Sequence, residues 1–269
     1  MNGSSNIIRE VYDYKELLWA LTYRDIRVKY KQAVFGVLWA FFMPMMGILA
    51  GVVVQVGLAF MKGTSLQMEN VVSVMVRMVP YSLFIGVLSS SASGILGGMG
   101  LASKIYFPRQ LIPLSTTLSV LVDFAISLVV VVLLVAFLPG SPLVLSWWLL
   151  LVAPLLGLLL AMGLGLGLIF GSANLFLRDV KYIMAVLIQF GIFFTPVLYF
   201  VDQLGPSGRI MLWNPVAPVL EAISDIVTRG EVRDLLWPYL GYSTLVAALL
   251  LVIGTLIFRK TEHLFAEVM

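Results

Sequence analysis

The chain has 269 residues and a net charge of +3, and 61% of its residues are hydrophobic while only 12% are charged. Soluble domains carry roughly 25% charged residues, so this composition excludes an ordinary soluble protein and indicates an integral membrane protein. The sequence has no cysteine and only one histidine, His263, which excludes disulfides and thiolate metal sites and disfavours a histidine metal centre.

An amphipathic helix is predicted over residues 14–33, and an apolar segment follows it without room for a loop. At 100° per residue, an aromatic stripe and a basic stripe lie side by side on this helix. The aromatic stripe contains Trp19, Tyr23 and Tyr30, and the basic stripe contains Arg24, Arg27 and Lys31. Aromatic rings prefer the level of the lipid headgroups, and basic side chains there meet lipid phosphates. The helix is therefore either a plain interfacial anchor or a site that receives a phosphate-bearing lipid headgroup.

Six apolar stretches are long enough to cross a bilayer as helices, which takes about 20 residues each. They are residues 35–60, 79–98, 111–138, 147–170, 182–200 and 239–258. An even number of spans places both termini on one side of the membrane. Twelve of the 17 lysines and arginines belong to the segments on that side, so the positive-inside rule assigns it to the cytoplasm. Because the basic residues flank the spans, the net charge indicates topology and not nucleic-acid binding.

The short cytoplasmic loop between the second and third spans contains exposed aromatic residues. Ile105, Tyr106 and Phe107 follow one another there, flanked by Lys104 and Arg109. Exposed rings with basic neighbours normally need a partner surface, which predicts docking of another protein. The alternative is that the rings return to the membrane interface.

Two features lie inside the spans. Asp123 is near the middle of the third span, where a carboxylate is costly and is a functional candidate. No Lys or Arg lies within a predicted span, so we favour a structural role for Asp123 as a protonated or hydrogen-bonded group. Gly163, Gly167 and Gly171 recur every four residues, which predicts close packing of helices within one subunit.

Aromatic residues in and near the spans are candidates for the wall of a transport pathway, where rings stack on sugar faces, although most such rings pack internally or face lipid. The candidates are Trp39, Phe42, Phe193, Phe194 and Tyr199. The longest external connection contains the helix breaker at 205–208 and prolines at 215 and 218. Residues 205–237 are therefore predicted to form two short helices that dip into the bilayer and return. Such helices must be buried in protein or line a cavity.

The sequence lacks the motifs of several enzyme classes. The sequence has no G-x-x-x-x-G-K-[ST], no G-x-S-x-G and no H-E-x-x-H, so the chain by itself is not expected to be an enzyme or to hydrolyse ATP. It also lacks the ladder of intramembrane charges typical of proton- or sodium-driven carriers. Its cytoplasmic acidic residues are scattered, which argues against a membrane-embedded glycosyl- or phosphotransferase. A passive scaffold or channel is a further alternative.

Four segments in this order resemble the membrane subunit of type-2 ABC exporters for polysaccharides and polyol phosphates, the family of O-antigen and teichoic acid export permeases. They are LTYRDIRVKYKQAVFGVLWAFFMP (21–44), KIYFPRQLIP (104–113), NLFLRDVKYI (174–183) and NPVAPVLEAI (214–223). The resemblance covers nearly the whole chain. It implies that residues 1–269 form one all-α membrane domain with 14–33 as interface helix, 100–107 as coupling helix and 205–237 as an external re-entrant pair.

The resemblance also implies partners and cargo. It implies a homodimer in the plasma (inner) membrane of a bacterium, bound to two copies of a separate ABC ATPase that carries the ATP and Mg. The coupling contact would then involve Ser103, Lys104, Ile105, Tyr106 and Phe107. This chain would bind no cofactor and no metal. The implied cargo is a polysaccharide on undecaprenyl diphosphate, with the lipid diphosphate meeting the basic stripe; teichoic acid, another lipid-linked cargo or a drug is the alternative.

Overall fold

The computed structural model describes residues 12–31, 38–102, 108–138 and 143–262. Within these ranges the chain folds into helices only, which confirms the predicted all-α class. In chain order the elements are α2 (Lys15–Lys31), α3 (Leu38–Met61), α4 (Met68–Ala102), α5 (Leu111–Phe137), η1 (Trp147–Leu151), α6 (Val152–Phe176), α7 (Val180–Phe194), η2 (Val201–Trp213), α8 (Val216–Arg229) and α9 (Leu236–Thr261).

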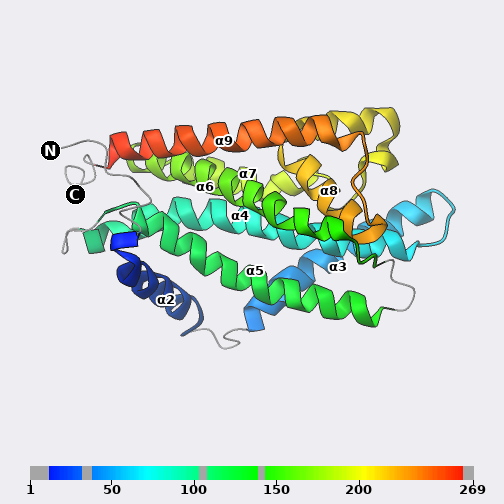
Figure 1. Cartoon of the computed structure of the whole chain (residues 1–269), viewed down its shortest axis with the longest axis horizontal. Coiled ribbons are helices and arrows are strands. Elements are labelled where there is room, and N and C mark those ends of the chain that lie inside the picture. The colour runs from blue at the N-terminus through cyan, green and yellow to red at the C-terminus, as the bar shows by residue number, and fades with distance from the viewer. Residues whose placement is uncertain (1–11, 32–37, 103–107, 139–142, 263–269) are drawn as a thin grey trace.

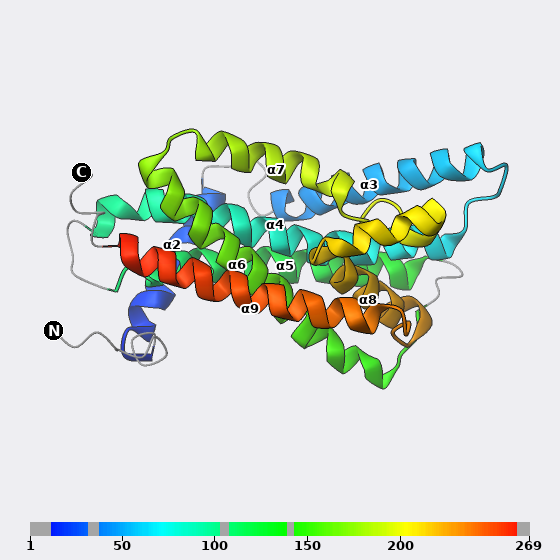
Figure 2. The same cartoon turned by 90° about the horizontal axis from the view of Figure 1, so that it is seen from above.

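The long helices form one elongated bundle (Figure 1; Figure 2). α4 is the central helix and packs against α5 and α6, while α9 packs against α6. In the most apolar stretch of α4, 78% of the residues are buried, against 17–28% in the four other long helices. Those four helices therefore turn most of their apolar surface outward, as helices do that face lipid or another membrane subunit.

Five helices are long and apolar enough to cross a membrane. They are α3, α4, α5, the continuous η1–α6 unit and α9, and they match the predicted spans at 35–60, 79–98, 111–138, 147–170 and 239–258. The predicted span at 182–200 is not confirmed, because α7 has only 15 residues. That length is about 22 Å, against about 30 Å of hydrocarbon. Thr195 is extended, as expected of a residue that precedes a proline, and α7 therefore ends before Pro196.

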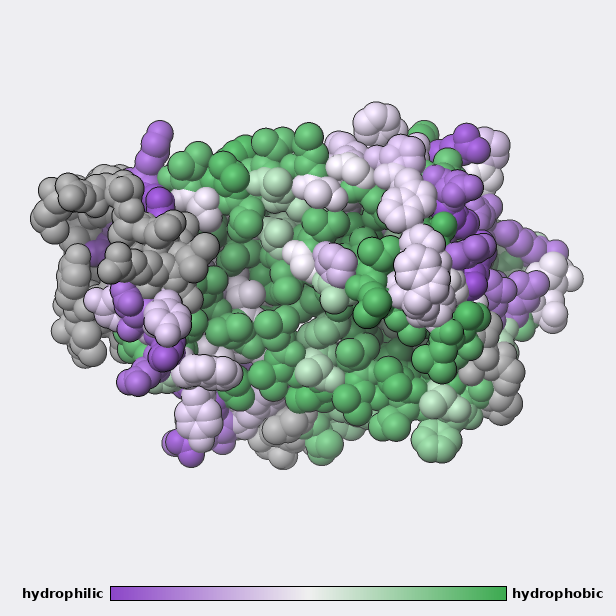
Figure 3. Space-filling view, in the orientation of Figure 1, coloured by the Kyte–Doolittle hydropathy of each residue, from purple (hydrophilic) through white to green (hydrophobic). Residues whose placement is uncertain are grey.

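Polar surface gathers at the two ends of the bundle, with an apolar band between them (Figure 3). One end, called here the α2 end, contains α2 and the C-terminal ends of α4, α6 and α9. The opposite end, called the α8 end, contains η2, α8 and the α3–α4 connection. Four of the five basic residues predicted to be external line one cavity at the α8 end: Lys62, Arg77, Arg229 and Arg233.

The long connection between α7 and α9 contains two short helices, η2 and α8, close to the predicted pair at 205–237. Gly205 has a φ of 62°, a left-handed conformation that interrupts η2, and Gly230, at 79°, ends α8. Every residue from Val216 to Ile226 is buried. Their dip into the bilayer stays a prediction, but burial within protein is the condition that such a dip requires.

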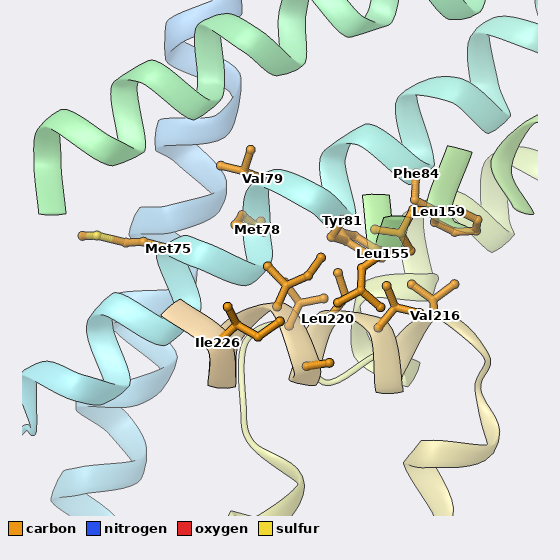
Figure 4. Close-up of a cluster of buried hydrophobic side chains, with 14 of the residues drawn as sticks. Met75, Met78, Val79, Tyr81, Phe84, Leu155, Leu159, Val216, Leu220 and Ile226 are labelled. Atoms are coloured by element: carbon orange, nitrogen blue, oxygen red, sulfur yellow. The ribbon is translucent and has the colours of Figure 1, made fainter. Parts of the chain in front are cut away.

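The main core lies where α8 meets α4 and α6 (Figure 4). It includes Met75, Met78, Tyr81 and Phe84 of α4, Leu155 and Leu159 of α6, and Val216, Leu220 and Ile226 of α8. Close approach of α6 to α4 explains the glycine pattern. A Cβ atom added at Gly163 would lie 2.9 Å from the carbonyl oxygen of Phe84, and one at Gly167 would lie 2.6 Å from the Ser91 Cβ. The predicted close packing within one subunit is confirmed.

Candidate functional site

α2 lies along the start of α5 through a small apolar contact. Leu21 is buried against Leu111 and Ile112, with Leu17 and Leu18 packed beside it. The leucines recur at helical spacing, so they form one face of α2 and dock it on α5. This contact decides which face of the helix remains free.

Two polar contacts extend this docking toward the bilayer. Asp25 accepts a hydrogen bond from Ser115 Oγ at 2.9 Å. One turn further along α2, Lys29 and Tyr30 both donate to the carboxylate of Asp123 on α5. Asp123 is thus hydrogen-bonded at a helix interface, as the sequence predicted. Its basic partner comes from the interface helix and not from a span, which is why span composition did not reveal it.

Tyr30 is a neutral hydrogen-bond donor to Asp123. Burial, the hydrogen bond to Asp123 and the negative charge of that carboxylate all raise the pKa of Tyr30. The phenol is neutral at physiological pH even with its ordinary pKa, and the raised pKa means that it remains a hydrogen-bond donor at higher pH as well. Asp123 therefore receives one charged donor and one neutral donor from consecutive residues of α2.

A polar cavity of about 620 Å³ opens between α2, α4 and α5. Its basic and acidic groups are Arg24, Asp25, Lys29 and Asp123, and its hydroxyl groups are Ser89, Ser90, Ser93, Thr116 and Ser119. Arg24 donates to Asp25 at 2.6 and 3.0 Å. Both basic side chains are therefore held by carboxylates next to a surface rich in hydroxyls. A phosphate needs such donors, because arginine and lysine make charge-assisted hydrogen bonds to its oxygens.

An apolar cavity of about 450 Å³ adjoins the polar one. The two share Gly86, Val120, Lys29 and Asp123, so the Lys29–Asp123 ion pair lies at their junction. The apolar cavity continues toward α3 and α7, where Trp39, Met43 and Ile192 are among its lining residues. Adjoining polar and apolar spaces suit an amphipathic ligand, with a charged group in the first and a hydrocarbon chain in the second.

The structure divides the predicted basic and aromatic stripes. Arg24 and Tyr30 line the two cavities. Trp19, Tyr23, Arg27 and Lys31 are exposed on α2, with the Arg27 guanidinium 5.0 Å from the ring centroid of Tyr23. Lys29 is not among the site residues predicted from the sequence. Its position one helical turn after Asp25 could have indicated that the two side chains lie on the same face of α2. The serines of α4 that line the polar cavity are also absent from that prediction.

The predicted pathway aromatics lie on α3, on α7 and in the segment after α7. Trp39 lines the apolar cavity and makes an edge contact with Phe42. Phe193 and Phe194 are exposed on α7. Tyr199 donates from its hydroxyl to the carbonyl oxygen of Phe193 at 2.7 Å, which is a structural contact. The predicted coupling residues 103–107 lie outside the described residues.

Arg77 corrects a prediction about the spans. The second span was expected to begin at Val79 and to contain no basic residue, but α4 begins at Met68 and carries Arg77 with only 2% of its surface exposed. Arg77 donates to Glu221 of α8 at 2.9 Å. Arg233 also donates to Glu221, and to Asp225, each at 2.6 Å. The sequence did not reveal this cluster, because Arg77 lies at the edge of an apolar segment and falls within the predicted loop before it. Its partner Glu221 lies 144 residues away in the chain.

Comparison with known proteins gives a consistent family assignment. The chain is 25% identical over 262 residues to "O-antigen export system permease protein RfbA" of Klebsiella pneumoniae, covering 94% of this chain and 95% of that protein. It is 26% identical over 268 residues to the protein of the same description from Myxococcus xanthus, covering 97% and 98%. The ABC-2 type transporter family matches residues 16–227. With the all-helical membrane bundle, this match shows that the chain belongs to the ABC-2 type transporter family.

Proposed function

We propose that this chain is the permease subunit of an ATP-driven exporter. It would move an O-antigen-like polysaccharide, linked to undecaprenyl diphosphate, from the cytoplasm to the outer face of the bacterial plasma membrane. The observation that carries the proposal is similarity along 94–97% of the chain to O-antigen export permeases. The adjoining polar and apolar cavities beside α2 support it, because a lipid diphosphate has both a strongly charged group and a hydrocarbon chain.

The geometry suggests how the lipid diphosphate is received. Arg27 and Lys31 are exposed on α2, where they would meet the headgroup first. Arg24 and Lys29 would then hold it in the polar cavity. Both are paired with carboxylates, Asp25 and Asp123. A diphosphate would compete with these carboxylates for the same donors, and the serine hydroxyls of α4 would satisfy its remaining oxygens.

Transport of the glycan needs a path lined by protein, because a sugar hydroxyl left unpaired in hydrocarbon costs several kcal/mol. We place this path between two copies of the chain, whose outward-facing apolar helices would contact lipid or the second copy. The energy would come from two ABC ATPase subunits bound at the α2 end, which we assign to the cytoplasm together with both termini. Teichoic acid on the same carrier lipid would suit the same cavities, but the names of the relatives favour O-antigen.

The first test is assembly with an ATPase. The full chain is co-expressed with a candidate ABC ATPase from the same organism, purified, and reconstituted with lipid-linked glycan. We expect co-purification and ATP hydrolysis that rises when the glycan is added. The variant Tyr106→Ala, Phe107→Ala is expected to lose either the partner or the coupling of hydrolysis to export. A chain that purifies alone, or an ATPase indifferent to the glycan, would contradict the proposal.

The second test addresses the basic residues of α2. Replacing Arg24, Arg27 and Lys31 with Gln is expected to reduce export at least about tenfold, since one charge-assisted hydrogen bond contributes about 1.5–3 kcal/mol. Export is measured as polymer reaching the outer face of cells, and topology by protease protection. The matched control, Lys181→Gln, Arg259→Gln, Lys260→Gln, removes the same charge at the same end and should export normally.

Two double variants distinguish the first encounter with the headgroup from its binding in the cavity. Arg24→Gln, Lys29→Gln alters the cavity, whereas Arg27→Gln, Lys31→Gln alters only the exposed face. The first pair should raise the concentration of lipid-linked glycan needed for half-maximal ATPase stimulation more than the second pair does. If the triple variant exports normally, the basic stripe is only a membrane anchor.

A further inference from the structure

A second polar cavity, of about 330 Å³, lies at the α8 end of the bundle. Its walls come from α3, the α3–α4 connection, α4, η2 and α8. It shares no lining residue with the two cavities beside α2. Ligand pockets usually enclose about 300–1,000 Å³, so this space is the size for a small molecule or one unit of a polymer.

The charges around this cavity balance. Its lining contains the basic residues Lys62, Arg77, Arg229 and Arg233 and the acidic residues Glu69, Asp202, Glu221 and Asp225. Arg233 donates to Asp202, Glu221 and Asp225, each at 2.6 Å. Burial lowers the pKa of Arg233, but the hydrogen bond to Asp225 and the negative charges of the three carboxylates raise it by more. The net effect is a raised pKa, and the guanidinium stays charged. Because the ionic groups neutralise one another, the cavity selects neither an anion nor a cation by net charge.

The remaining lining is rich in neutral hydrogen-bonding groups. The amides are Gln55, Gln67, Asn70 and Gln203, and the hydroxyls are Thr64, Ser65, Ser73, Ser224 and Thr228. Amides and hydroxyls both donate and accept, so they match a ligand whose groups do the same. A sugar hydroxyl is such a group. Phe200 adds one aromatic ring to this lining, which offers an apolar face to the C–H side of a sugar ring.

Several of these groups are fixed in place before any ligand binds. Gln55 is 1% exposed and donates to the carbonyl oxygen of Leu198 at 2.8 Å, and Gln203 donates to Gln55 Oε1 at 3.0 Å. Ser73 and Ser224 are buried in the two facing helices. A site whose side chains are already ordered loses little conformational entropy on binding.

One buried donor in this wall lacks a partner. Among the described residues, Arg77 Nε is buried and makes no hydrogen bond, although the Arg77 Nη groups bind Glu221 and two carbonyl oxygens. The Arg77 guanidinium lies 4.4 Å from the ring centroid of Phe200. Because this Nε nitrogen is buried, it does not open onto the cavity, and the guanidinium instead packs on the Phe200 ring within the wall.

We propose that the cavity at the α8 end binds one neutral sugar unit. Size, balanced charge, ordered amides and hydroxyls and an aromatic ring together match this class of ligand. The inference rests on the proposed function for the source of the sugar, which would be the glycan that emerges at this end. Sugar binding itself is a property of the single chain and can be measured without the ATPase.

The test uses the purified full chain in lipid nanodiscs and isothermal titration with free sugars. The probes are glucose, galactose, mannose, rhamnose and N-acetylglucosamine, with glucuronate, inorganic phosphate and phosphoethanolamine as charged comparisons. We expect at least one neutral sugar to bind with a millimolar dissociation constant, and the charged compounds to bind at least tenfold more weakly. Preferential binding of phosphate or phosphoethanolamine, or no binding of any neutral sugar at tens of millimolar, would overturn the proposal.

Variants locate the binding. Asn70→Leu and Gln67→Leu each replace an amide of the lining with an apolar group at a position that is not fully buried, and each should weaken sugar binding at least tenfold. The control Thr244→Leu changes a residue of α9 outside this lining and should bind sugar normally. Thermal unfolding of each variant verifies that it is folded. Unchanged affinity in both lining variants would place the sugar elsewhere and contradict the inference.

The outcomes separate the two proposals. Glycan-stimulated ATPase activity without sugar binding to the single chain would remove the sugar site and leave the exporter proposal intact. Sugar binding by a chain that neither assembles with an ATPase nor supports export would remove the exporter proposal and leave the site.

Discussion

Glu221→Gln is expected to lower the free energy of unfolding by about 3–5 kcal/mol, because it removes the charge that pairs with a buried arginine. The side chains of Arg77 and Glu221 are only 3% and 1% exposed, so water cannot replace the lost partner. Glu221 also accepts from Arg233 at 2.6 Å, which leaves two guanidinium groups short of negative charge. The measurement is chemical unfolding of the purified chain in detergent micelles, followed by circular dichroism.

Glu69→Gln is the matched control for this prediction. Glu69 lines the same cavity and pairs with Arg229 at 3.7 Å, but both side chains are nearly half exposed. An exposed ion pair contributes about 0–1 kcal/mol, so this variant should unfold almost like the wild type. The double variant Arg77→Met, Glu221→Gln should recover part of the loss, because it no longer buries the Arg77 charge. If Glu221→Gln and Glu69→Gln lowered the free energy of unfolding equally, burial of the Arg77–Glu221 pair would not contribute to stability, and the prediction would be wrong.

Gly165→Leu is expected to destabilise the bundle by about 3 kcal/mol, near the upper end for overpacking. A Cβ atom at Gly165 would lie 2.5 Å from the Leu250 carbonyl carbon, and one at Gly254 would lie 2.4 Å from the Gly165 carbonyl oxygen. Both contacts are with backbone, which cannot move aside as a flexible side chain does. The two helices must therefore separate. The expected observation is a lower midpoint of thermal unfolding in detergent and poor recovery of monodisperse protein.

Gly157→Leu makes the same substitution on the same helix where space is open. Nothing lies within 4 Å of a Cβ atom built at Gly157. Leucine also has a higher helix propensity than glycine, which is roughly 0.8–1 kcal/mol less favourable than alanine, whereas leucine ranks just below alanine. This variant should therefore be at least as stable as the wild type. Comparable destabilisation at both positions would argue that the α6–α9 contact is not close.

The glycines illustrate what the spacing of residues predicted and what it missed. Gly163, Gly167 and Gly171 recur every four residues, and the predicted close contact is the one that α6 makes with α4. Gly165 belongs to no such repeat, yet it makes the closest approach to α9. The period of a helix identifies a face of small residues, whereas a single close crossing depends on where two axes meet, which no local pattern records.

The same distinction between local pattern and helix packing applies to the two polar cavities and their ion pairs. The amino-acid sequence alone predicted a helical membrane protein with six spans, five of which are long helices in the structure, and a basic, amphipathic α2. These properties follow from composition and periodicity, which act within each segment. Only the tertiary structure decided that Lys29 meets Asp123 and that Arg77 meets Glu221, because each pair joins helices far apart in the chain. It also decided that hydroxyls of α4, α5 and α8 line two separate polar cavities, since the packing of the helices determines which polar side chains share one enclosed space.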